Sequence, residues 1–446
     1  MIAYVAALFI LWMVVILRRL LTSPLPRPTD VAQLSVFFYN APLALVATLP
    51  IADALDGYAI FLNTIAGDSE LAATTLLLAV AACASLEVGR HFGGLCLRDA
   101  KYRTSLRVKA SLKLQLNATR ICLGGLLTVF LGIALFGVDA FFAGYAIESN
   151  SGSASEGVAL IFFAYETIGL CAFVWLVCRL ATGKSAGTWM VLISLAVIFT
   201  LTLIRGKRLE MIIALLPFIL ILWSTKLRTF SSRFAMVSFL VLSVSAMASF
   251  RFGEMPDVAA LAFNIFSEGL YAGHVTPGLV EAVKTQSIPM EGGIRFAAAV
   301  AALVPRFIFP AKDELIYQSL TDVSEFAPLG ATSMLAEVYL QGGLVACILF
   351  FGVIGIIGRR LEIKSLLGSG GSLPVKTFFY IVFLCSFIPH FRDGIIPAIK
   401  IPMQLLIMLG FLFVISQVRL SKVRLSASVL KKSATTSTEP PTLQTV

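Results

Sequence analysis

The feature that most constrains this chain is a succession of about eleven apolar runs, most of them long enough to cross a membrane as a helix. A helix needs roughly 20 mostly apolar residues to span the hydrocarbon core, with about 17 as the lower limit. The expected spans are 2–17, 34–51, 71–86, 118–136, 158–178, 188–203, 209–224, 234–250, 333–357, 375–389 and 395–415. Hydrophobic residues make up 58% of the sequence and charged residues 13%, whereas soluble domains are about a quarter charged. The sequence therefore predicts an all-α integral membrane protein and excludes a set of soluble domains.

Lysine and arginine are concentrated in every second connection between these runs. The basic residues of the odd-numbered connections and the tail include Arg18, Arg19, Arg27, Arg90, Arg98, Lys101, Arg103, Arg107, Lys109, Lys113, Arg179, Lys184, Lys226, Arg228, Arg233, Arg359, Arg360, Lys364, Arg419, Lys422, Arg424, Lys431 and Lys432. Short basic connections stay in the cytoplasm. We therefore expect the N-terminus outside and the C-terminus inside. The net charge of +10 is accounted for by these connections, so we expect no nucleic-acid partner.

This pattern divides the chain into four parts. Residues 1–250 carry the first eight spans, 251–332 form one long external segment with short helices, 333–418 carry the last three spans, and 419–446 form a cytoplasmic tail. Ser, Thr and Pro are frequent in the tail, which we expect to be disordered. Within the external segment we expect a glycine-proline turn at 276–278. The apolar run 296–304 is too short to span and predicts an interfacial or re-entrant helix.

Several cations stand on the external side, against the rule that keeps basic residues inside. They are Arg205, Lys207, Arg208, Arg251 and Arg392, each at the end of an apolar run. An arginine drawn to the bilayer centre costs up to ~3 kcal/mol, so an anionic ligand would account for their placement. Guanidinium groups bind phosphate oxygens through two parallel hydrogen bonds. The alternative is that these cations anchor the loops or pair with carboxylates, and the same two interpretations stay open for Arg295 and Arg306.

Two further ionisable residues lie at the external ends of spans. Glu337 lies just inside the ninth expected span, where an ionisable group is costly and by default functional. It could either act in catalysis or pair with an arginine and fix the bundle. His390 could act as a base near neutral pH, or serve as a polar anchor. The three histidines are scattered, and no cysteine–histidine or paired-aspartate spacing is typical of a metal site. We expect no metal and no other cofactor.

Motifs spread over roughly residues 200–400 resemble those of the O-antigen and related oligosaccharide repeat-unit polymerases. They are 205–208 before the run 211–222, SFRFG at 249–253, VPRFIFPAK at 304–312, 333–343 with its Glu-Val-Tyr and Gly-Gly, and FRDG at 391–394. The order and spacing of these short motifs carry the resemblance. The first half of the chain is similar to the family only in its succession of spans.

The resemblance implies a metal-independent membrane glycosyltransferase of the bacterial cytoplasmic membrane, with its active site facing the periplasm. Its donor would be an oligosaccharide on a polyprenyl diphosphate such as undecaprenyl diphosphate, and its acceptor a second lipid-linked unit. Arg208, Arg251 and Arg392 would hold the diphosphate, with Arg205 in the same set and Arg306 helping to position it. Glu337 and then His390 are the candidate bases. Besides this lipid-linked substrate, the expected partners are membrane lipid and a chain-length regulator.

Three alternatives share parts of this pattern. An O-antigen ligase of lipopolysaccharide synthesis would use the same donor with a lipid A core acceptor. A transporter or flippase for an anionic lipid-linked substrate would need polar residues along both halves of its spans, and the inner halves here are apolar. A non-catalytic assembly protein would tolerate loss of the arginines. We therefore expect a polymerase first and a ligase second.

Overall fold

The computed structural model describes most of the chain, and the account below is confined to the part it describes. The described residues are 2–48, 69–98, 105–136, 154–205, 208–251, 269, 272–304, 308–312, 314–316, 332–366, 372–416 and 421–423. Side chains at some helix ends lie outside this description, among them those of Arg205, Arg208 and Arg251.

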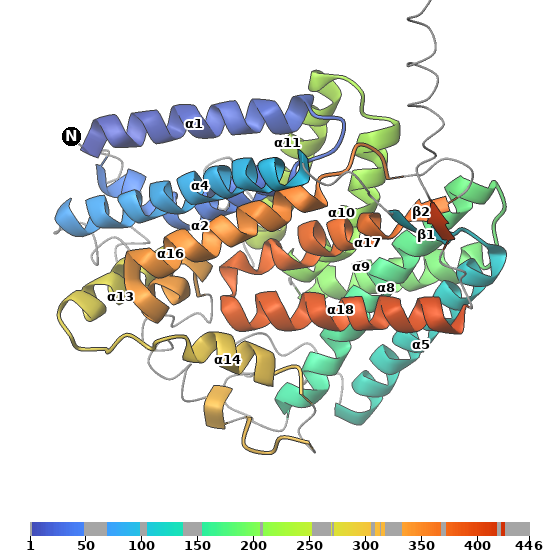
Figure 1. Ribbon diagram of the computed structural model, residues 1–446. Helices are drawn as coiled ribbons and strands as arrows, with labels where there is room; N and C mark the ends of the chain where they lie inside the picture. Colours follow the sequence, from blue (N-terminus) through green and yellow to red (C-terminus); the bar gives the residue numbers. More distant parts are fainter. Residues whose placement is uncertain are drawn as a thin grey trace, which may run out of the picture.

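The described chain is mainly helical (Figure 1). Its long helices are α1 (Ile2–Thr22), α2 (Pro28–Thr48), α4 (Ser69–Arg98), α5 (Leu112–Phe136), α8 (Ala154–Thr182), α9 (Thr188–Arg205), α10 (Arg208–Thr225), α11 (Phe230–Arg251), α16 (Met334–Leu361) and α18 (Ile395–Ile415). Helix α17 (Val375–Val382) continues through a π-helical turn, η3 (Phe383–Phe387), into a 3-10 helix, η4 (Pro389–Arg392). Two shorter helices, α13 (Val275–Lys284) and α14 (Ile294–Ala301), lie within residues 251–332, the segment expected to be external.

Seven helical segments among the described residues are long and apolar enough to cross a membrane. They are Tyr4–Thr22, Glu70–Leu95, Leu112–Leu135, Ala164–Thr182, Met334–Leu361, Val375–Arg392 and Ile395–Ile415. The expectation of a helical multi-pass membrane protein is therefore confirmed. Each of the eleven expected runs overlaps a helix, but the number of spans, and which end of the chain faces outside, stay predictions.

Helices α4 and α16 make the closest crossing of the bundle, and glycines make it possible. A Cβ added to Gly89 would lie 2.0 Å from the carbonyl oxygen of Gly352, and one added to Gly355 would lie 2.2 Å from that of Leu86. Small residues let two backbones approach closely where lipid supplies no hydrophobic drive for helix association. Figure 1 shows α16 running alongside α4 and α2.

We expect Gly355→Ala to destabilise the protein by about 1–3 kcal/mol, the usual cost of overpacking, because its methyl group would meet backbone that cannot move independently. Gly410→Ala on α18 is the matched control, since nothing lies within 4 Å of the added Cβ there. The measurement is the unfolding of both variants in the same detergent. Equal stability of the two variants would contradict the close crossing.

Residues 21–29, which comprise the end of α1, the start of α2 and the connection between them, mark one end of the bundle; they are called the 21–29 connection below. Trp223 near the end of α10 and Arg233 near the start of α11 donate hydrogen bonds to main-chain carbonyls of this connection, at 3.2 and 2.9 Å. The Tyr380 hydroxyl of α17 donates to a third carbonyl at 2.7 Å. Gly358 near the end of α16 lies against Thr29. Helices α10, α11, α16 and α17 therefore all contact residues 21–29, which shows which part of each helix lies at this end of the bundle.

The other ends of these four helices carry most of the residues predicted from the sequence. Arg208 begins α10, Arg251 ends α11, Glu337 lies in the first turn of α16, and His390 and Arg392 lie in the 3-10 helix η4 that follows α17. A helix of 18 residues, the length of α10, is about 27 Å long. The backbone positions of these five residues thus lie at the end of the bundle away from the 21–29 connection.

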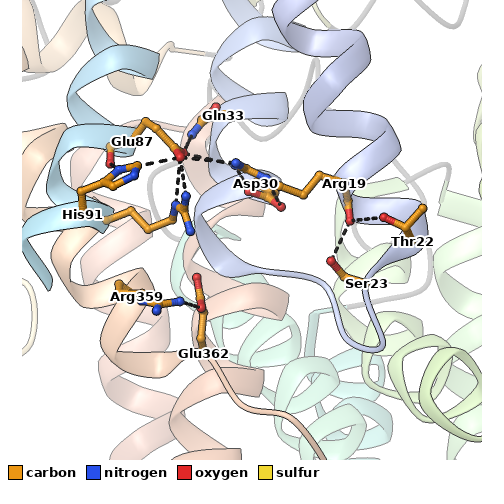
Figure 2. Close-up of polar contacts among 10 residues, drawn as sticks. Arg19, Thr22, Ser23, Asp30, Gln33, Glu87, His91, Arg359 and Glu362 are labelled. Atoms are coloured by element: carbon orange, nitrogen blue, oxygen red, sulfur yellow. Dashed lines mark hydrogen bonds and ion pairs between the residues drawn. The ribbon is translucent and has the colours of Figure 1, made fainter. Parts of the chain in front are cut away.

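A network of ion pairs closes the 21–29 end (Figure 2). Arg19 of α1 pairs with Asp30 of α2 and, at 3.1 Å, with Glu87 of α4. Glu87 also pairs with Arg90 and accepts a 3.0 Å hydrogen bond from Gln33. The charges of two arginines and two carboxylates balance in this network. It joins α1, α2 and α4, and each of its four charged side chains has a partner of opposite charge.

A three-stranded antiparallel sheet was not expected from the sequence. Strand β1 (Ser105–Lys109) pairs on one side with β2 (Ser372–Pro374) and on the other with β3 (Ser421–Val423). The all-α prediction therefore needs this correction, and the tail expected to be disordered contributes a strand at 421–423. Three-residue strands are too short to give an alternating pattern, and only their pairing with β1 stabilises them.

The glycine-proline turn expected at 276–278 is also wrong. These residues lie in the first two turns of α13, which begins at Val275. Proline is tolerated in the first helical turn because its missing N–H would have no partner there. The short helix expected within 296–304 is present as the eight-residue α14.

Candidate functional site

Glu337 lies buried at the start of α16, with only 2% of its surface exposed. Its Oε1 accepts a 2.8 Å hydrogen bond from the Thr332 hydroxyl, and its Oε2 accepts a 2.7 Å bond from the backbone N–H of Ile395, the first residue of α18. Because both carboxylate oxygens are engaged, the side chain ties the start of α18 to the start of α16.

Arg295 is fully buried and lies between two carboxylates. Its Nη1 is 3.4 Å from Glu337 Oε1, and its Nε and Nη2 donate to Glu291 at 2.8 and 2.9 Å. Gln341 accepts a hydrogen bond from the backbone N–H of Arg295 and donates one to Glu291. These four residues, Glu291, Arg295, Glu337 and Gln341, form the Arg295 cluster. A buried charge is tolerated only with such pairing, so the cluster fixes the start of α14 against α16.

Two glycines shape the backbone beside the Arg295 cluster. Helix α16 is interrupted at Gly342 and Gly343, and Gly343 has φ 62° with ψ −151°, a conformation open essentially only to glycine. Gly394, with φ 94°, brings the main chain so close to Glu337 that an added Cβ would lie 2.2 Å from its Oε1. The Asp393–Ile395 turn can therefore contact the carboxylate only with glycine at position 394.

We expect Gly394→Ala to cost more stability than Gly293→Ala. Both glycines have φ near 100°, but the added Cβ would meet nothing within 4 Å at Gly293, whereas at Gly394 it would collide with the Glu337 carboxylate. The backbone strain common to both is about 1–3 kcal/mol. Unfolding of the two variants in one detergent measures the difference. Equal losses would mean that Gly394 does not touch Glu337.

His390 forms a second buried cluster one turn before Gly394. Its Nδ1 lies 2.8 Å from Asp393 Oδ2, and its Nε2 lies 3.7 Å from Glu166 Oε1 of α8. His390 is 5% exposed and Glu166 is also buried. These three residues form the His390 cluster. It connects to the Arg295 cluster through the chain, because Asp393 is two residues before the Ile395 N–H that binds Glu337.

The structure brings some of the predicted residues together. Glu337 and His390 lie in the two neighbouring clusters, and half-buried Arg392 lies between His390 and Asp393 in the chain. Pairing with an arginine, one of the two roles left open for Glu337, is observed, and its partner is Arg295. For Arg205, Arg208 and Arg251 the described backbone gives only their helix ends, and Arg306 lies outside the described residues.

Four members of these clusters were not predicted as site residues, namely Glu166, Asp393, Glu291 and Gln341. Glu166 is a carboxylate inside the apolar segment Ala164–Thr182, so the rule that singled out Glu337 applies equally to it. Glu291 and Gln341 had no comparable signal, because they are polar residues of ordinary type that meet only in the folded chain.

Within the described ranges, no group of three or more His, Cys, Asp or Glu side chains is arranged to hold a metal ion. No family model, curated protein or solved structure matches the chain. The site therefore has to be interpreted from its own chemistry, which is that of buried, paired charges at one end of a membrane bundle.

Proposed function

We propose that this protein is a glycosyltransferase that polymerises polyprenyl-diphosphate-linked oligosaccharide units at the outer leaflet of the bacterial cytoplasmic membrane. The observation that carries the proposal is the gathering at one bundle end of Arg392, the Arg295 and His390 clusters, and the helix ends that bear Arg208 and Arg251. Intramembrane ionisable groups are costly and by default functional. An anionic lipid-linked substrate gives the cations of this end a common ligand.

The chemistry of such a transfer suits arginines. A hydroxyl oxygen of the acceptor sugar bonds to the anomeric carbon of the donor, and the bond from that carbon to the diphosphate oxygen breaks. Polyprenyl diphosphate leaves with the electron pair, and the hydroxyl proton passes to a base. Preorganised cations in a water-poor site stabilise the negative charge that develops on the leaving group. Arg208, Arg251 and Arg392 are assigned this role, with Arg205 and Arg306 as further members of the set.

The contacts of Glu337 suit a residue that positions neighbouring helices better than the base that removes the hydroxyl proton of the acceptor sugar. Each of its carboxylate oxygens already accepts a hydrogen bond, and Oε1 also faces the Arg295 guanidinium. Taking a proton from the substrate would require these contacts to be released. We therefore assign Glu337 to the positioning of α14, α16 and the Asp393–Ile395 turn.

An assay with two acceptors tests the proposed function against its rivals. Purified protein in proteoliposomes receives the polyprenyl-diphosphate-linked oligosaccharide, with or without a lipid A core acceptor, and without nucleotide. A polymerase makes a ladder in steps of one repeat unit from the donor alone. A ligase makes product only with the lipid A core, and a transporter makes neither product but moves the lipid between leaflets. Either of the last two results would overturn the proposal.

A further inference from the structure

The imidazole of His390 is enclosed by two carboxylates that come from distant parts of the chain. Asp393 follows it in the same turn, and Glu166 comes from α8. The side chains of His390 and Glu166 are almost completely buried, and that of Asp393 is 20% exposed. Each ring nitrogen faces a carboxylate oxygen, at 2.8 Å for Nδ1 and 3.7 Å for Nε2.

A neutral imidazole fits this arrangement poorly. Its two nitrogens are then one donor and one acceptor, whereas an ionised carboxylate only accepts. In a neutral ring, the acceptor nitrogen would direct its lone pair at a carboxylate oxygen. The doubly protonated ring presents an N–H to each carboxylate, and its positive charge lies next to the buried Glu166 carboxylate and the partly exposed Asp393 carboxylate.

We infer that Glu166 and Asp393 together hold His390 as a doubly protonated imidazolium, so that both of its ring N–H groups face carboxylates and the ring does not act as the base of the site. The exclusion of His390 as the base of glycan transfer rests on the proposed function. The ring's ion-pair partners among the described residues are these two carboxylates. Glu337 of α16, which also packs against this turn, is engaged by Arg295 and Thr332. Glu166 is then a positioning residue, because it acts through His390.

Nitrogen-15 NMR of histidine-labelled protein measures directly whether each ring nitrogen of His390 carries a proton. The full chain carries three histidines, so His91→Gln and His390→Gln spectra assign the signals. The sample is held at about pH 8, where an unperturbed imidazole is neutral. We expect both ring nitrogens of His390 to be protonated under these conditions.

Glu166→Gln removes one carboxylate charge and keeps the side-chain shape, and we expect it to shift the Nε2 signal of His390 to that of an unprotonated nitrogen. Glu166→Asp is expected to retain the protonated signal. Glu87→Gln is the matched control, because it removes an intramembrane carboxylate that faces His91 at the other end of the bundle. It is expected to leave His390 unchanged.

An unprotonated ring nitrogen on His390 in the wild-type protein would overturn the inference, including the case in which a neutral Glu166 donates the proton to Nε2. So would a His390 spectrum that is the same in wild type and Glu166→Gln. The wild-type spectrum needs neither a variant nor a substrate. Failure of the glycan-transfer assay would therefore refute the proposed function while leaving this protonation state separately measurable.

Discussion

Arg295→Ala protein is expected to be about 3–5 kcal/mol less stable than wild type, the usual loss when one partner of a buried charge cluster is removed. The substitution would leave Glu291 and Glu337 facing each other across a cavity without a cation. It would also remove the guanidinium contacts between α14 and α16, while the hydrogen bonds of Gln341 to the Arg295 N–H and to Glu291 could stay in place. Chemical or thermal unfolding in one detergent measures the loss.

The control for Arg295 is Lys284 of α13, another cation of the segment 251–332. Its ion pair with Glu70 is exposed, at 43% and 86% for the two side chains, so Lys284→Ala should change stability by less than about 1 kcal/mol. Replacing Arg295 by Met together with Glu291→Gln and Glu337→Gln should recover part of the loss, because no unpaired charge is then buried. An Arg295→Ala protein as stable as the Lys284→Ala control would contradict the burial and pairing described for this cluster.

Arg392→Ala is expected to slow glycan transfer by about 10²–10³-fold, the usual effect of losing one preorganised donor to a developing negative charge. Arg392→Lys should recover only part of the rate, because an ammonium group keeps the charge but not the planar pair of donors. The measurement is the initial rate of chain extension with a fixed amount of lipid-linked donor. Thermal stability of each variant is measured alongside, so that a loss of folding is recognised.

Arg359 provides the matched cation at the opposite end of the bundle. It is partly exposed and pairs with Glu362 three residues later, near the 21–29 connection. We expect Arg359→Ala to retain the wild-type rate. A similar loss in both variants would indicate a general effect of arginine removal, and wild-type activity in a folded Arg392→Ala protein would remove Arg392 from the site.

The helical part of the fold could be predicted because membrane helices are recognisable in a sequence as long runs of apolar residues. The run 375–389 illustrates the limit of this signal. Its length and composition predict one helix, but the chain changes to a π-helical turn and then to a 3-10 helix that ends at Arg392. Strands β2 and β3 were missed for a different reason, since three residues carry no periodicity and depend on a partner, β1, distant in the sequence.

The candidate site was predictable only where a single residue carried the signal. Glu337 stood out because a carboxylate within a span is costly, and the same rule would have found Glu166. Which cation pairs with Glu337 could not be deduced, because Arg295 lies in the short helix α14 between the eighth and ninth expected spans and meets α16 only through folding. The contact of Gly394 with Glu337 likewise depends on a positive φ that no neighbouring residue indicates.

The most direct test of the central claim is chain extension by purified protein in lipid, with the polyprenyl-diphosphate-linked repeat unit as the only substrate and Arg208→Ala protein in parallel. The account predicts a ladder of products from the wild-type protein, and little or none from the variant at equal amounts of folded protein. Intact substrate in both reactions, with a donor confirmed as active by a known polymerase, would contradict the proposed function. A ladder from both proteins would contradict the role given to Arg208.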